Sequence, residues 1–209
     1  QVIENGTVVV TGGVISHVLK EGESIPINPS HYKVISAEGK ALLPGFVDPH
    51  THFVFGGYRE EEFAWRMRGD SYMDIMNRGG GIVNTTRATR AASEDELFAV
   101  GKQRLDAMMQ LGITTVEGKS GYGLDKETEL KQLRVMRRLN EEHPVDIVST
   151  FMGAHATPAE WKDREDEFID FNINEVMPVV KQEKLAECAD IFCEKNVFTT
   201  GQSRRYLTA

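Results

Sequence analysis

The sequence predicts an α/β fold of the (β/α)8 TIM-like barrel type, with about the first half of the barrel present and part of a small β-sandwich domain ahead of it. Apolar strand-like segments alternate with amphipathic helical segments from residue 43 onward, which is the pattern of a parallel sheet. Each strand-like segment ends in polar residues, as expected where a site lies at the carboxyl edge of a barrel. Four such strands are present, whereas a complete barrel has eight in roughly 250 residues.

The boundary between the two regions follows from this change of pattern. We expect residues 1–42 to be part of the β-sandwich domain and residues 43–209 to be the first four β/α units of an incomplete barrel. In the first region, Asn-Gly and Gly-Gly pairs at residues 5–6 and 12–13 each precede a strand-like run, and such pairs supply the positive φ angles of hairpin turns. A doubly wound open sheet would also place ligands at its strand ends. No glycine-rich phosphate loop follows the first strand of the second region, which favours the barrel.

The barrel elements follow from apolar runs and from helix boundary signals. Strands are expected at residues 42–47, 113–116, 145–152 and 189–193. Ser93 and Glu96 form a capping box ahead of one helix, Asp125 can cap the next, and Thr199 or Thr200 opens the last. A helical stretch over residues 163–184 contains Pro178, which predicts a kink or a split there. Residues 53–92 are expected to form a long loop region.

The composition argues against several function classes. The 209 residues include 24 Lys+Arg and 32 Asp+Glu, giving a formal net charge of -8, whereas a nucleic-acid or anionic-membrane partner favours a basic face. No apolar run reaches the roughly 18 residues of a membrane span, and residues 1–20 lack the layout of a secretory signal. Cys188 and Cys193 are expected to be reduced, buried thiols, which favours a cytoplasmic protein.

His50 and His52 are the leading candidates for metal binding. They lie two residues apart at the end of the first barrel strand, and residues i and i+2 of a strand point to the same side. Two neutral imidazoles held side by side suit a divalent ion such as zinc or iron. A bare His-x-His pair is more often just two hydrogen-bonded polar side chains, but this pair directly follows Leu-Pro-Gly-Phe-Val-Asp-Pro, which favours the metal. His17, His31 and His143 are expected on the surface.

Several motifs resemble one enzyme family. Residues 43–52, Leu-Pro-Gly-Phe-Val-Asp-Pro-His-Thr-His, resemble the first strand of the amidohydrolase superfamily. The continuation is similar to the imidazolonepropionase family, in the same order along the chain: Phe-Gly-Gly-Tyr-Arg-Glu-Glu-Glu-Phe at 55–63, Gly-Gly-Gly-Ile at 79–82, Thr-Arg-Ala-Ala-Ser at 89–93, Lys-Ser-Gly-Tyr-Gly-Leu at 119–124 and Phe-Met-Gly-Ala-His-Ala at 151–156. The resemblance extends from about Val8 to Leu207.

The resemblance implies a reaction in histidine degradation, the hydrolysis of the ring amide of 4-imidazolone-5-propanoate to N-formimidoyl-L-glutamate by a metal-activated water. It implies that His50 and His52 bind one metal ion, zinc or iron. It also implies that Arg59, Tyr122 and His155 bind the substrate. The guanidinium of Arg59 suits a propionate carboxylate, and His155 is expected to be catalytic by hydrogen bonding the carbonyl oxygen, where negative charge develops.

Three further residues receive weaker expectations. Lys119 is given a supporting electrostatic role, Glu117 is expected to be a surface residue, and Glu194 is expected to end the fourth strand and to orient a ligating histidine. The remaining partner expectations are a small-molecule substrate, no nucleic acid and no membrane, with a homodimer left open.

The chain departs from the family in lacking several functional residues. The family's other metal ligands, a histidine from the fifth strand and an aspartate from the eighth, and a glutamate for proton transfer have no counterpart here. We therefore expect these 209 residues to be a piece of a longer protein and to be inactive alone. Two alternatives stay open: another cyclic amidohydrolase or nucleobase deaminase of the superfamily, and an inert fragment that pairs through its open sheet edges.

Overall fold

A computed structural model describes residues 2–71, 74–75 and 78–209. The chain divides into two compact units, one ending at Pro44 and the other starting at Gly45. In the first unit, β1 (Thr7–Thr11) and β2 (Val14–Leu19) form an antiparallel hairpin. Gly12 and Gly13 connect them with φ angles of 59° and 81°, as the Gly-Gly pair predicts. A 3-10 turn, Pro29–His31, follows.

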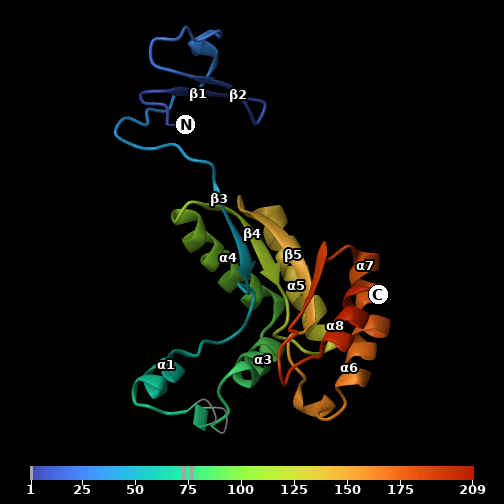
Figure 1. The fold of residues 1–209 in the computed structure, drawn as a ribbon. Helices are drawn as coiled ribbons and strands as arrows, with labels where there is room; N and C mark the ends of the chain where they lie inside the picture. The colour runs from blue at the N-terminus through green and yellow to red at the C-terminus, as the bar shows by residue number, and fades with distance from the viewer. Residues whose placement is uncertain (1, 72–73, 76–77) are drawn as a thin grey trace. The chain divides into compact units, whose positions relative to one another are not determined.

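The second unit contains a parallel four-stranded sheet. Its strands are β3 (Phe46–Thr51), β4 (Ile113–Lys119), β5 (Asp146–Ala154) and β6 (Cys188–Ile191), and they pair in chain order. Each neighbouring pair is parallel, so all four carboxyl ends lie at one edge. The sheet is curled, and the mixed α/β unit fits a part of a TIM-like barrel (Figure 1).

Helices follow the strands and cover the sheet. In chain order they are α1 (Glu60–Met67), α3 (Ile82–Ala91), α4 (Glu94–Gln110), α5 (Lys126–Glu142), α6 (Glu165–Phe171), α7 (Met177–Glu183) and α8 (Thr200–Leu207). Helix α4 packs on β4 and α5, α5 packs on β5, and α8 packs on β6. A 3-10 turn, Ala159–Trp161, precedes α6. In Figure 1 the helices flank the parallel strands, as β/α units require.

The helix boundaries agree closely with the sequence signals. Ser93 and Glu96 form the expected capping box of α4, Asp125 caps α5 by accepting from the Thr128 amide, and Thr199 caps α8. The stretch predicted to break near Pro178 is divided by a π-helical segment, Asn172–Val176, so that Pro178 lies in the first turn of α7. Helix α7 continues from the π-helical segment without a break, and this irregular turn just ahead of Pro178 accommodates the proline within the helical run.

The hydrophobic core lies between the helices and one face of the sheet. Helix α5 contributes Leu133, Met136 and Leu139, and the strands contribute Val116 and Phe151, all fully buried. Burying side chains of this size stabilises the fold by roughly 1.5–3 kcal/mol each. The opposite face of β4 carries Glu117 and Lys119, so this strand has one apolar and one polar side.

Two expectations about this unit are wrong. Residues 42–47 were expected to form a buried strand, but the strand starts at Phe46, and Leu42, Leu43, Phe46 and Val47 are exposed. The reason is that β3 is an edge strand that pairs only with β4 among the described residues. Residues 53–92 are not simply a loop, because they contain α1 and α3. Helix α3 has the sequence IVNTTRATRA, whose β-branched residues have low helix propensity, and buried threonines hold it in place.

Two smaller expectations also fail. Cys188 and Cys193 are free but exposed, because β6 is the other edge strand of the described sheet and Cys193 lies beyond its end. His143, the residue after α5, is buried: its Nδ1 accepts a hydrogen bond from the Val145 amide, and its Nε2 lies 3.2 Å from the carboxylate of Asp106 on α4. Among the described residues, none of the helices has the length and apolar character needed to cross a bilayer.

Candidate active site

Three strand ends bring the main candidate side chains together. His50 lies in β3 and His52 directly after it, Tyr122 follows β4 by three residues, and His155 directly follows β5. Because these strands are parallel neighbours, their carboxyl ends meet at one edge of the sheet. Residues that are far apart in the sequence but follow neighbouring strands therefore lie close together in space, as the sequence predicts.

The rings of these residues form one cluster. The centroids of His50 and His52 are 5.9 Å apart, and His52 stacks on His155 at 4.8 Å with nearly parallel planes. Tyr122 contacts His52 at 5.0 Å and His155 at 5.3 Å, edge to face in both cases. The predicted metal-binding pair and two of the predicted substrate contacts thus lie within one aromatic and imidazole group.

Burial favours the neutral form of the His52 and His155 rings. Desolvation, together with the neighbouring rings of His155 and His50, lowers the pKa of His52 to about 3. Desolvation also lowers the pKa of His155, and the hydrogen bond to the Gly121 carbonyl opposes this shift. A neutral imidazole has one ring nitrogen with a free lone pair, and that nitrogen is the one that can bind a metal ion.

The hydrogen bonds orient each ring. Nδ1 of His155 lies 2.9 Å from the Gly121 carbonyl oxygen, and because a carbonyl only accepts, this nitrogen carries the proton. Nε2 of His155 is then the atom left for a ligand. Nδ1 of His52 is buried and has no hydrogen-bond partner among the described residues. An orphaned, neutral ring nitrogen beside a second histidine is the environment of a metal ligand, so this pair fits a bound ion.

The pair supplies only part of a coordination shell. No group of three or more His, Cys, Asp or Glu side chains within residues 2–71, 74–75 and 78–209 is arranged to hold a metal ion. Metal sites of hydrolytic enzymes take three or more protein ligands. Any ion held by His50 and His52 therefore needs ligands beyond those that the described chain supplies.

An ion-pair network around the buried Lys119 lies beside the cluster on the polar face of β4. The ammonium of Lys119 is 2.7 Å from a Glu117 carboxylate oxygen and 2.8 Å from one of Asp190, and the Thr150 hydroxyl donates to the same Glu117 oxygen at 2.7 Å. Burial would lower the pKa of Lys119, but its hydrogen bonds to Asp190 and Glu117 raise it. Lys119 is therefore a fixed positive charge that joins β4 to β6.

Arg59 lies apart from the histidines. It is the residue before α1, is partly exposed, and its guanidinium is 3.8 Å from the Glu62 carboxylate. A cavity of about 290 Å³ lies beside it, and neither His50, His52 nor His155 lines it; its lining includes Tyr58, Arg59, Glu62, Trp65 and Arg78. The ring of Phe55 lies between this cavity and the histidine cluster. Its centroid is 6.3 Å from that of Tyr58, which lines the cavity, and 5.7 Å from that of Tyr122. The charge of Arg59 also acts on the Tyr122 phenol, whose pKa burial raises and Arg59 lowers.

Sequence reasoning missed three residues and misplaced two. Asp190 was not singled out, although it lies on the fourth strand and pairs with Lys119, and neither were the buried Glu129 and Gln132 of α5. A signal for Glu129 and Gln132 was present, since both lie on the helix face that carries Leu133 and Met136.

Glu194 does not end a strand but lies exposed in the turn after β6, with its carboxylate accepting from the Lys195 amide. Glu117 is partly buried in the Lys119 network, not a free surface residue.

Fold and site together define a class, an α/β protein with a histidine cluster at the carboxyl edge of a curled parallel sheet. Comparison with curated proteins is more specific. The chain is 58% identical over 207 residues to the imidazolonepropionase of Clostridium tetani (strain Massachusetts / E88), which covers 99% of this chain and 49% of that protein. It is 57% identical over 209 residues to the imidazolonepropionase of Parabacteroides distasonis, covering 100% and 50%. The imidazolonepropionase of Bacteroides thetaiotaomicron is 57% identical over 212 residues, covering 100% and 51%.

These matches confirm the resemblance to imidazolonepropionase over the whole chain. The chain spans about half the length of the curated relatives it matches. No family model matches the chain. The activity of the whole protein is therefore a question of its own.

Proposed function

We propose that this chain is the N-terminal part of an imidazolonepropionase, which hydrolyses the ring amide of 4-imidazolone-5-propanoate to N-formimidoyl-L-glutamate in histidine degradation. The observation that carries the proposal is the cluster of His50, His52, Tyr122 and His155 at three adjacent strand ends. The identity of 54–58% to proteins of this name over the full chain supports it. The 209 residues alone are proposed to be inactive, because the metal site needs further ligands.

His50 and His52 are the residues proposed to hold the metal ion, which would be zinc or iron. The support is the buried Nδ1 of His52, which has no hydrogen-bond partner within the part of the chain that the structure describes, and the neighbouring ring of His50. When bound, such an ion supplies a water that is deprotonated near neutral pH and a positive charge beside the ring carbonyl. The stacked ring of His155 keeps the His52 ring from turning, so that the ligating nitrogen stays in one direction.

Arg59, Tyr122 and His155 are proposed to bind the substrate. The guanidinium of Arg59 would pair with the propionate carboxylate in two parallel hydrogen bonds. Tyr122 offers its ring face and one hydroxyl beside His52. His155 would act as the catalytic residue through Nε2, because Nδ1 is engaged by the Gly121 carbonyl. The neutral ring already carries its one proton on Nδ1, so Nε2 would first have to take up a proton before it could donate to the carbonyl oxygen, where negative charge develops.

The domain assignment and setting complete the proposal. Residues 1–42 would be part of a β-sandwich domain, for which the β1–β2 hairpin is the support, and residues 43–209 the first four β/α units of a (β/α)8 barrel. A reducing, cytoplasmic setting suits two free, exposed thiols. The net charge of -8 suits a small-molecule substrate better than nucleic acid or a membrane surface. A homodimer stays open.

The test is turnover by the complete protein that carries this sequence. The metal-loaded protein is incubated with 4-imidazolone-5-propanoate, and N-formimidoyl-L-glutamate is measured by mass spectrometry. Guanine is the comparison substrate, since a deaminase of nucleobases would release ammonia from it. We expect product from the imidazolone and no ammonia from guanine. An intact imidazolone after prolonged incubation, or release of ammonia from guanine, would contradict the proposal.

A further inference from the structure

The loop that carries Tyr122 is held by side chains to an unusual degree. We call residues 120–125, between β4 and α5, the Tyr122 loop. Gly121 has a φ of 103°, and Leu124, which is not glycine, has a φ of 55°. A leucine in the left-handed region is strained and persists only where its surroundings enforce it. The enforcing contacts come from α5.

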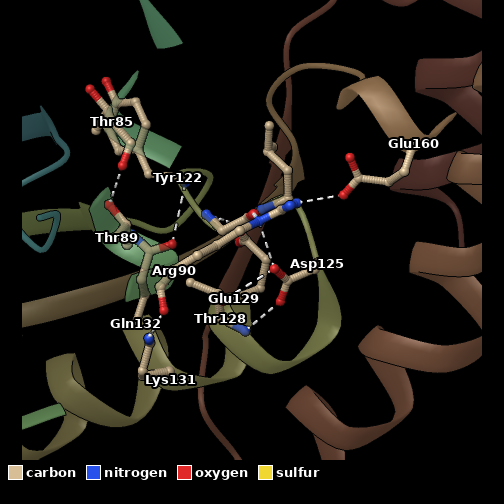
Figure 2. A network of polar contacts seen from close by, with 12 residues as sticks. Thr85, Thr89, Arg90, Tyr122, Asp125, Thr128, Glu129, Lys131, Gln132 and Glu160 are labelled. Atoms are coloured by element: carbon tan, nitrogen blue, oxygen red, sulfur yellow. Dashed lines mark hydrogen bonds and ion pairs between the residues drawn. The ribbon is translucent and has the colours of Figure 1, made fainter. Parts of the chain in front are cut away.

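Glu129 binds three amides of this loop with one carboxylate. Its Oε1 and Oε2 accept from the Gly121 N–H at 3.1 and 3.0 Å, and Oε1 also accepts from Gly123 at 2.8 Å and from Leu124 at 2.9 Å. The side chain is fully buried, and Figure 2 shows it below the loop, beside Asp125 and Thr128. Burial raises the pKa of Glu129, and the hydrogen bonds from Ser120 and from the loop amides oppose the shift.

Gln132, one helical turn later, completes the set. Its Oε1 accepts from the Tyr122 N–H at 3.2 Å, and its Nε2 donates to the Val54 carbonyl at 2.6 Å. Val54 lies two residues after His52. Two buried side chains of α5 therefore engage every amide from Gly121 to Leu124, and one of them also holds the chain that leaves β3.

The carbonyl side of the loop is engaged as well. The Gly121 carbonyl accepts from His155 Nδ1 at 2.9 Å, and the Gly123 carbonyl accepts from Arg90 Nε at 2.7 Å. The loop thus sets the position of Tyr122 through its amides and the direction of the His155 ring through one carbonyl. Both rings lie against His52. Gln132 also binds the chain two residues after His52, at the Val54 carbonyl.

We propose that Glu129 and Gln132 are positioning residues that fix Tyr122 and His155 relative to His52, and so set the geometry in which substrate is bound. The proposal rests on the proposed function, because it assigns the purpose of the held loop to the substrate contacts of Tyr122 and His155. Neither residue touches the reacting group. Their effect passes through the loop backbone, which makes it visible both in substrate binding and in the exchange of the loop amides.

The first variant is Glu129→Gln in the complete protein. The glutamine keeps the shape but places an N–H2 group against loop N–H groups, and it removes the charge that strengthens these bonds. We expect amide hydrogen exchange at residues 121–124 to accelerate about tenfold or more, since bonds to a charged group are the stronger ones. We also expect KM for the imidazolone to rise about tenfold with a smaller change in kcat, while the metal content stays unchanged. The matched control is Glu127→Gln, an exposed position on the same helix.

The second variant is Gln132→Met, which removes both hydrogen bonds without adding a buried charge. We expect faster exchange at Tyr122 and a raised KM, whereas Gln103→Met, at an exposed position of α4, should change neither. Unchanged loop exchange together with a KM within about twofold of the unmodified protein in both variants would overturn the proposal. So would exchange that accelerates equally throughout the sheet, since that result indicates a merely structural role.

Different results would contradict the proposed function and the positioning role of Glu129 and Gln132. If the unmodified complete protein does not hydrolyse the imidazolone, the proposed function fails, and the exchange measurement still decides whether α5 holds the loop. If the unmodified protein turns over and the two variants behave like their controls, the positioning role fails while the function stands.

Discussion

Replacing Lys119 by methionine tests how the polar face of the sheet is stabilised. The ammonium joins Glu117 on β4 and Asp190 on β6 at 2.7 and 2.8 Å, and the Lys119 side chain is only 6% exposed. Methionine fills similar space but leaves two carboxylates close together without a cation. Removing one partner of a buried ion pair costs about 3–5 kcal/mol. Because the Asp190 side chain is 38% exposed and water can solvate it, we expect about 3 kcal/mol, the lower end of that range.

The assay is urea unfolding of the complete protein, with Lys102→Met as the matched control. Lys102 pairs with Asp106 at 3.1 Å on the surface of α4, and both side chains are largely exposed, so its loss should cost less than about 0.5 kcal/mol. If Lys119→Met destabilises the protein no more than Lys102→Met does, the network contributes nothing beyond an exposed pair and the reasoning is wrong.

The pH dependence of this stabilisation has a definite sign. The hydrogen bond from Lys119 lowers the pKa of Asp190 against the effect of burial, so the contribution of Asp190 is present above its ordinary pKa and is lost as the pH falls through the lowered value. The pKa of Lys119 is raised, so its contribution is lost as the pH rises through that value. The difference in stability between the unmodified protein and Lys119→Met should therefore be largest near neutral pH and shrink in acid.

Three further substitutions have distinct expected outcomes. Arg59→Met should raise KM for the imidazolone about tenfold or more with little change in kcat, because a charge-assisted contact to the carboxylate is lost. The exposed control Arg68→Met should leave KM unchanged. An unchanged KM in Arg59→Met would show that Arg59 does not bind the substrate. Gly121→Ala should lower the free energy of unfolding by about 1–3 kcal/mol. The φ angle there is 103°, and the added Cβ would lie 2.9 Å from His155 Cβ and from the Met152 carbonyl oxygen. The control Gly201→Ala, whose added Cβ has no heavy atom nearer than 3.9 Å, should be neutral or stabilising. Tyr206→Phe should leave the unfolding free energy within about 1 kcal/mol or raise it, since the buried phenol oxygen has no hydrogen-bond partner among the described residues; a larger loss in urea unfolding would show that a partner exists.

The parts of the fold that local signals determine were predictable from the sequence. The Gly-Gly turn, the caps at Ser93, Asp125 and Thr199, and the break near Pro178 each depend on a few neighbouring residues. Helix α3 was missed because its helical state depends on tertiary contacts: the buried Thr89 hydroxyl accepts a hydrogen bond from the Gly56 amide, which lies outside the helix. Propensity alone argues against that helix.

The sequence predicted the site residues that lie at strand ends, but not the side chains that hold them in place. The placement of His52, Tyr122 and His155 follows from the alternation of strands and helices, and the structure does bring them together. Which side chains hold these residues could not be read from spacing, because Glu129 and Gln132 form hydrogen bonds across 5 to 78 residues of chain. The pairing of Asp190 with Lys119 likewise spans 71 residues. Polar residues on an otherwise apolar helix face are the local signal that points to Glu129 and Gln132.

Elemental analysis of the complete protein, purified without chelator and compared with its His50→Ala/His52→Ala variant, tests the central assignment most directly. We expect about one zinc or iron ion per chain in the unmodified protein and at least a hundredfold weaker retention in the variant, since even residues behind the ligands change metal affinity by about 10–100-fold. Equal metal content in both proteins, or turnover by a metal-free protein, would contradict the assignment.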